Sequence, residues 1–162
     1  MRFLYKTFLT IALCTGISVS SFAQVNEEMS DFTNEIEAMR TVLQTERKIL
    51  IMNEMTLTAE EAGKFWPIHD AYRAEVKKIG NLRVKVITDY AASYETMTDE
   101  VAKQLLDESI KFEEQLIKLK KKHVKKFRAI LPDIKVTRYF QLENKLDAII
   151  DYDLAAQIPL ME

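Results

Sequence analysis

Few side chains in this sequence could do covalent or acid–base chemistry. The chain has two histidines, His69 and His123, and one cysteine, Cys14. Glu113 and Glu114 are adjacent acids, but consecutive residues on a helix point apart, so they do not form a carboxylate pair. The sequence has no glycine-rich loop to hold a phosphate, and no serine stands in the turn context of a hydrolase nucleophile. We therefore predict that the protein is not an enzyme and uses no cofactor.

Neither histidine has the neighbours of a metal ligand. Lys120, Lys122 and Lys126 surround His123 within about one helical turn, and their positive charge repels a cation. The position of His123 between apolar residues favours a packed, neutral core histidine instead. His69 stands beside Asp70 with no third ligand near it in sequence. We predict no metal ligands.

A dense run of cations lies between residues 118 and 128. Its members are Lys118, Lys120, Lys121, Lys122, Lys125, Lys126 and Arg128. All except Lys120 fall on one side of a helix, and we call these six the basic band. One interpretation is a solvated helix face that offsets the negative end of the helix dipole. The other is a surface that attracts acidic unfolded chains, anionic lipid head groups or the acidic patch of a partner.

The first 23 residues have the order of a secretory signal. Arg2 and Lys6 precede an apolar run, and Ala23 ends a small-x-small cleavage site. Cys14 leaves open a lipoprotein signal, but the bulky residue before it fits that pattern poorly. We expect residues 1–23 to be removed and residues 24–162 to form a single helical domain in the periplasm, where there is no ATP.

Removal of Arg2 and Lys6 would leave 21 basic residues against 25 acidic ones. No later apolar run approaches the roughly 20 residues that span a bilayer, so we predict no membrane segment after cleavage. An exported, net-acidic chain without interleaved aromatic residues is also a poor candidate for binding nucleic acid.

Glycine and proline are so rare that the pattern predicts an all-α fold of about four helices. Thr58 and Glu61 form a capping box at the start of a long helix, and Pro67 predicts a kink or break inside it. The expected helices cover residues 31–52, 58–94 and 99–131, with a fourth from Pro132. The short turn after Tyr94 makes the two long helices an antiparallel hairpin between flanking N- and C-terminal helices. The last ten residues are expected to form a docked coil.

The helix over residues 99–131 carries two apolar stripes. The first consists of Val101, Leu105, Phe112, Leu116, Leu119, Phe127 and Ile130. The second consists of Leu106, Ile110, Ile117, Val124 and Leu131. One stripe suffices to pack against a neighbouring helix. Two stripes indicate either burial among several helices or a second surface for a partner.

Arg83 falls on the predicted core face of its helix, where an unpaired charge is costly. Its head group either reaches water at the rim of the core or pairs with an acid such as Glu143.

Leu57 and Thr58, followed by Glu61, stand where the second helix opens, and Leu131 stands before the last helix. In these two places the chain resembles the LTXXQ-motif periplasmic family of the Spy and CpxP type. Glu61 replaces the glutamine of the family motif, and the second copy keeps only Leu131. Trp66 and Pro67 follow the first copy.

The resemblance implies an ATP-independent periplasmic chaperone or a modulator of envelope stress. A dedicated regulatory or structural subunit of one envelope partner is the alternative, and the family also has a metal-responsive branch. The implied partners are unfolded or partner proteins of the cell envelope, with a second copy of the chain as a further candidate. The basic band and the second stripe are the predicted binding surfaces.

Overall fold

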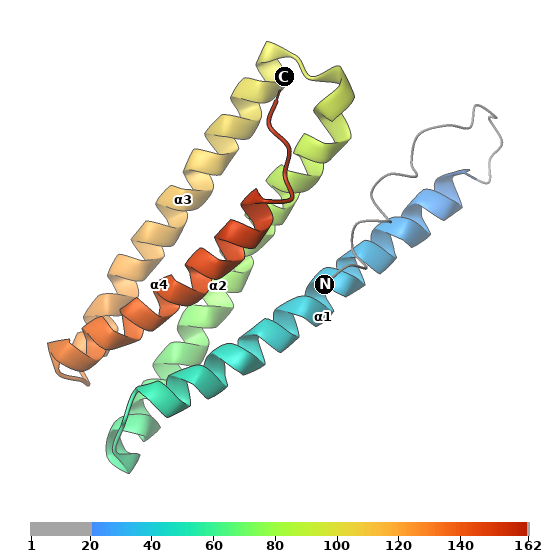
Figure 1. Cartoon of the computed structure of the whole chain (residues 1–162). Helices are drawn as coiled ribbons and strands as arrows, with labels where there is room; N and C mark the ends of the chain where they lie inside the picture. Colours follow the sequence, from blue (N-terminus) through green and yellow to red (C-terminus); the bar gives the residue numbers. More distant parts are fainter. Residues whose placement is uncertain (1–20, 162) are drawn as a thin grey trace. The chain divides into compact units, whose positions relative to one another are not determined.

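The computed structural model describes residues 21–161, with side chains from residue 38 onward. Its helices are α1 (Ser21–Glu54), α2 (Ala59–Ser93), α3 (Asp99–Arg128) and α4 (Asp133–Ala155), with a 3-10 turn, η2 (Tyr94–Thr96), after α2 (Figure 1). Residues 21–161 contain no strand. The predicted all-α class with four helices is confirmed.

Contacts divide the chain into two compact units, Met1–Glu46 and Arg47–Glu162. The hydrophobic core of the described residues lies in the second unit. The predicted signal peptide lies outside the described residues except for its last three positions.

Helix α1 is longer than predicted, because it begins at Ser21 rather than near residue 31. No glycine or proline lies between Ser21 and Glu54, so nothing in the sequence interrupts the helix there. At its C-terminal end, Arg138 Nε donates to the Glu54 carbonyl at 2.6 Å, and Lys135 Nζ donates to the Thr56 carbonyl at 3.3 Å. Two basic side chains of α4 thus satisfy carbonyl groups at and just beyond the end of α1.

Helix α2 begins as predicted and continues where a break was expected. The Glu61 amide donates to Thr58 Oγ1 at 3.2 Å, and the Thr58 amide donates to Glu61 Oε2 at 2.8 Å, which completes the capping box. Of the kink or break expected near Trp66, the break is wrong, because α2 is continuous through Pro67, and the kink stays a prediction. Pro67 leaves the carbonyl of Gly63 without its helical donor, but both residues are exposed, so water can replace that donor.

Replacing Pro67 with Ala is expected to raise the free energy of unfolding by about 1–2 kcal/mol. This is less than the roughly 3 kcal/mol cost of an interior proline, because alanine also gives the unfolded chain more freedom. Urea unfolding followed by circular dichroism measures the change. A Gly63→Ala variant, with no atom within 4 Å of the added methyl group, reports helix propensity alone. A Pro67→Ala protein no more stable than the wild type would contradict the prediction.

The predicted antiparallel hairpin of α2 and α3 is confirmed (Figure 1). Thr98 caps α3 by accepting a hydrogen bond from the Val101 amide at 3.3 Å. The predicted end of this helix at Leu131 is wrong, because α3 ends at Arg128. Leu131 precedes Pro132, whose ring disfavours helical geometry in the preceding residue, so the chain leaves the helix before it.

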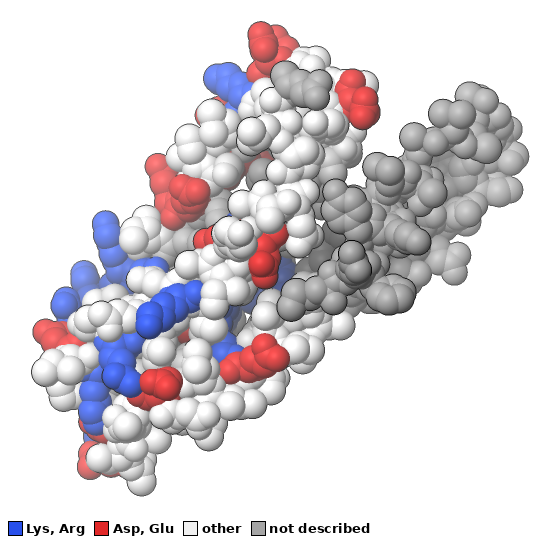
Figure 2. All heavy atoms as spheres, in the orientation of Figure 1, with Lys and Arg blue, Asp and Glu red and all other residues white. Residues whose placement is uncertain are grey.

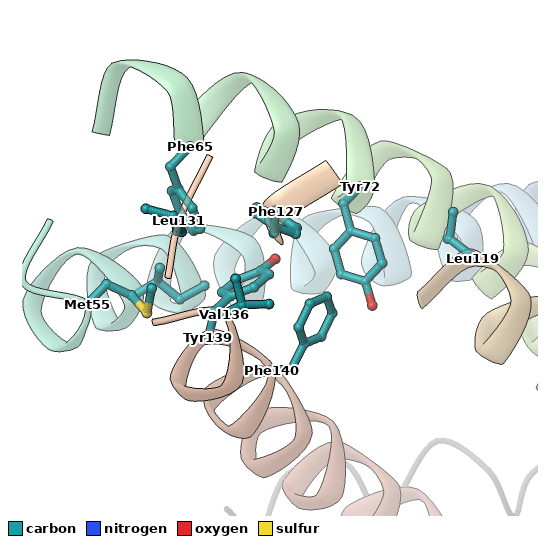
Figure 3. Close-up of a cluster of buried hydrophobic side chains, with 10 residues drawn as sticks. Met55, Phe65, Tyr72, Leu119, Phe127, Leu131, Val136, Tyr139 and Phe140 are labelled. Atoms are coloured by element: carbon teal, nitrogen blue, oxygen red, sulfur yellow. The ribbon is translucent and has the colours of Figure 1, made fainter. Parts of the chain in front are cut away.

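The core is an aromatic cluster near the turn that joins α3 to α4. Phe127 lies 4.7 Å from Tyr139 and 5.3 Å from Phe65 between ring centroids, and Figure 3 shows these side chains converging from three helices. Ile51 and Met55 close the cluster from the end of α1. On the first stripe, Leu105, Phe112, Leu119 and Phe127 are buried, and Val101, Leu116 and Ile130 are half-buried. The first stripe is therefore the core face of α3.

Candidate functional site

The second stripe is exposed over much of its length. Leu106 is 62% exposed, Ile110 48% and Ile117 49%. Further along α3, Val124 is half-buried against the core and Leu131 is buried. The second stripe is therefore exposed to solvent over its N-terminal part and packs against the core at its C-terminal end. We call Leu106, Ile110 and Ile117 the exposed stripe.

All six side chains of the basic band are exposed. Lys122 pairs with Glu75 at 2.9 Å and Arg128 pairs with Asp133 at 2.8 Å. The remaining four, Lys118, Lys121, Lys125 and Lys126, form no ion pair with any residue that the structure describes. We call them the four lysines. Figure 2 shows cationic side chains gathered over the part of α3 that approaches α4.

The exposed stripe and most of the four lysines lie on adjoining faces of α3. At about 100° per residue, Lys121 follows Ile117 by only about 40° around the helix axis, and Lys125 and Lys118 follow within about a further 60°. Lys126 lies on the far side of this group. An apolar strip that is followed along the helix by lysines without ion-pair partners can hold a chain that carries both apolar and acidic side chains.

A buried ion cluster that the sequence reasoning missed links α1, α2 and α4. Glu143 Oε2 accepts from Arg47 at 2.9 Å and from Arg73 at 3.0 Å, and Arg47 also donates to Asp147 at 2.9 Å. Glu143 is fully buried, and this burial raises the pKa of its carboxyl group despite the two guanidinium groups. The spacing of Val136, Tyr139 and Phe140 with Glu143 places that acid on the core face of α4, which is the signal that could have revealed it.

Arg83 pairs with an acid, as one alternative predicted, but that acid is Asp151 and not the suggested Glu143. It lies 2.5 Å from Asp151 of α4, and its guanidinium group stands 5.8 Å from the centre of the Phe112 ring. Glu143 already pairs with Arg47 and Arg73. Arg83 lies further along α2 than Arg73, and it meets Asp151, which lies two turns beyond Glu143 on α4.

Both histidines are packed in the core, as predicted for His123. His123 Nδ1 lies 3.2 Å from the Leu119 carbonyl, and burial lowers the pKa of its imidazole. His69 Nδ1 lies 3.0 Å from the Tyr139 hydroxyl, and burial lowers the pKa of His69 to about 4. Both rings are therefore neutral near pH 7.

The motif residues have structural contacts. Leu57 packs against the core, and Thr58 and Glu61 cap α2. Glu61 also pairs with Lys135 at 2.6 Å, which lowers the pKa of its carboxyl group. Trp66 packs edge-on against Phe65, with ring centroids 5.0 Å apart, and Lys48 Nζ stands 5.0 Å from the centre of its ring.

Over the described part of the chain, no three His, Cys, Asp or Glu side chains form a group that could hold a metal ion. None of the helices there is both long and apolar enough to cross a bilayer. Comparison of the chain with protein-family models, with curated proteins and with solved structures finds no match. The resemblance to the LTXXQ-motif family remains a prediction, and function has to be argued from the surface of α3.

Proposed function

We propose that this chain is an exported helical protein that binds non-native or partner proteins of the cell envelope without ATP. The observation that carries the proposal is the adjacency, on one helix, of the exposed stripe and the four lysines. Isolated exposed apolar residues are common on soluble proteins. Three of them in helical register, on the same helix as lysines that form no ion pair with a described acid, make a surface suited to a mixed apolar and acidic chain.

The size of this surface favours weak, reversible binding. Fully burying one Leu or Ile side chain contributes about 1.5–3 kcal/mol. Because the three side chains of the exposed stripe are already partly covered, together they contribute about 3 kcal/mol or slightly more. Association alone costs at least about 4 kcal/mol, so electrostatic attraction to the four lysines has to supply part of the affinity. Weak binding suits a protein that works without ATP, because the bound chain must then be released by simple dissociation.

The direct test measures aggregation of several unrelated proteins diluted from denaturant, with and without near-stoichiometric amounts of the chain and with no nucleotide. Slower aggregation of all of them supports the proposal. Failure to protect any of them, together with recovery of one specific envelope protein in a pull-down, would replace it with the dedicated-subunit alternative.

Changing all of the four lysines to Gln is expected to weaken client binding about tenfold at low salt and to leave folding intact, because these side chains point into solvent. Wild-type binding should weaken as salt rises, since exposed charges are screened over about 8 Å at physiological ionic strength. Fluorescence anisotropy with a labelled, unfolded acidic client measures both effects.

A matched control removes the same charge elsewhere on the surface. It changes four other exposed lysines to Gln: Lys64, Lys78, Lys85 and Lys145. Equal loss in both variants would mean that only net charge matters and would contradict a role for the basic band. The exposed stripe is tested by changing its three residues to Ser, with Ile134→Ser and Ile149→Ser as the control on α4. If neither surface change weakens binding, the proposed function is wrong.

A further inference from the structure

The C-terminal tail after α4 returns along the second half of α2. Tyr90 Oη donates to the Pro159 carbonyl at 2.8 Å, and Tyr94 Oη donates to the Leu160 carbonyl at 3.2 Å. The two tyrosines are one helical turn apart, and their ring centroids lie 5.7 Å apart in an edge-on arrangement. Figure 1 shows the tail running beside the C-terminal part of α2 toward η2. Residues 156–161 thus form a docked coil, whereas residues 153–155, which were predicted to belong to the coil, are the last turn of α4.

The tail is attached through its main chain more than through its side chains. Leu160, its largest apolar residue, is 87% exposed, and Met161 is 47% exposed. Only Ile158 is half-buried. The hydrogen bonds from Tyr90 and Tyr94 of α2 to this segment both use its backbone carbonyls as acceptors. An occupant held in this way leaves the side chain of Leu160 free and is easily displaced.

Hydroxyl groups that donate to successive backbone carbonyls do not distinguish one side chain from another. Every residue of an extended chain presents a carbonyl, so two tyrosine hydroxyls at this spacing can bind many sequences. Pro159 suits the segment, because proline lacks an amide hydrogen and favours extended geometry in itself and in the residue before it. The site therefore fits an extended stretch of polypeptide that has no regular secondary structure.

We propose that Tyr90 and Tyr94 form a binding site for extended segments of other polypeptides, and that the tail occupies this site in cis. This inference rests on the proposed function, because it takes the partners to be chains that are not folded. An incoming segment competes with the tail for the same two hydroxyls. The tail is tethered to α4, and its effective concentration is of millimolar order, so only segments present in excess or held at a second surface displace it.

Displacement of the tail can be measured in the full chain with a nitroxide label. Met161→Cys supplies the attachment point, and Cys14→Ser makes it the only thiol. The probe is an acetylated and amidated peptide that copies residues 157–161. Adding it at millimolar concentration should raise the mobile fraction of the label at least threefold in the electron paramagnetic resonance spectrum. No change in mobility up to saturation would overturn the proposal.

Two sets of variants separate the site from general effects. In the Tyr90→Phe, Tyr94→Phe double variant the label should be mobile without peptide and should not respond to it. Tyr152→Phe, which alters an exposed tyrosine on α4, should behave as the wild type. A label still immobile in the double variant would overturn the proposal.

The identity of the side chains is tested in the peptide. A peptide with Ala at the position of Leu160 should displace the tail within twofold of the parent peptide, because that side chain is exposed. If the Ala peptide displaced the tail tenfold less effectively, the site would recognise the Leu160 side chain, and recognition through the backbone would be contradicted. No aggregating client is present in these experiments. A negative result here combined with protection of clients would therefore remove this inference and leave the proposed function standing.

Discussion

Replacing Glu143 with Gln lowers the free energy of unfolding by about 3–5 kcal/mol, the cost of removing one partner from a buried ion pair. Arg47 and Arg73 both donate to Glu143, and no other acid accepts from Arg73 among the described residues. The variant keeps the volume of the side chain but leaves two guanidinium groups close together with little compensation. Urea unfolding followed by circular dichroism measures the loss.

The control for this experiment is Glu114→Gln, an exposed glutamate on α3. It should change stability by less than about 0.5 kcal/mol. A second variant replaces the cluster with apolar residues: Arg47→Met, Arg73→Met and Glu143→Leu. It should be more stable than Glu143→Gln, since an apolar core can substitute for a complete buried ion cluster. Equal stability of wild type and Glu143→Gln would show that the cluster does not hold α1 against α2 and α4.

Acidification from pH 7 to pH 4 is expected to cost the fold about 3 kcal/mol through His69 alone. Burial lowers the pKa of His69 to about 4, whereas an exposed histidine titrates near 6.5. Between these values the unfolded chain binds a proton that the folded chain does not, so stability falls as pH falls through this window. His123 has a pKa lowered in the same direction by burial and adds to the loss.

Comparison with His69→Gln isolates this contribution. Glutamine does not titrate, and it can still form a hydrogen bond with the Tyr139 hydroxyl. The raised pKa of Glu143 has the opposite effect on stability, because on acidification the folded chain takes up a proton at Glu143 more readily than the unfolded chain. This effect is present in both the wild type and His69→Gln, so it cancels in the comparison. The wild type should therefore lose about 3 kcal/mol more than His69→Gln between pH 7 and pH 4. Parallel pH profiles would contradict the neutral, buried state of His69.

Properties that depend on residues close together in the chain were predictable from the sequence. The capping box of Thr58 and Glu61 needs only residues three apart, and the first stripe of α3 follows from helical periodicity. The hairpin follows because the turn at η2 is too short for any other connection. The local errors were the start of α1, the end of α3 and the break at Pro67, where the exposure of Gly63, a property of the folded surface, decided the outcome.

The partners of charged side chains could not be predicted in this way. Periodicity places Arg83 and Glu143 on core faces, but the crossing of α2 and α4 decides that Arg83 meets Asp151 while Glu143 meets Arg47 and Arg73. The same applies to the candidate site. The second stripe is visible in the sequence, yet only the packing of α4 shows that Val124 and Leu131 join the core.

The sequence by itself therefore determined the helices, their caps and the core face of α3, because hydrogen bonds and side-chain spacing within a helix involve residues a few positions apart. The tertiary structure decided which lysines stay without an acid, which part of the second stripe stays open, and where the C-terminal tail lies. These features depend on distances between helices far apart in the chain. Those distances are set by the balance between burying apolar side chains and pairing charged ones across helices. The residue pattern of a single helix does not contain that information.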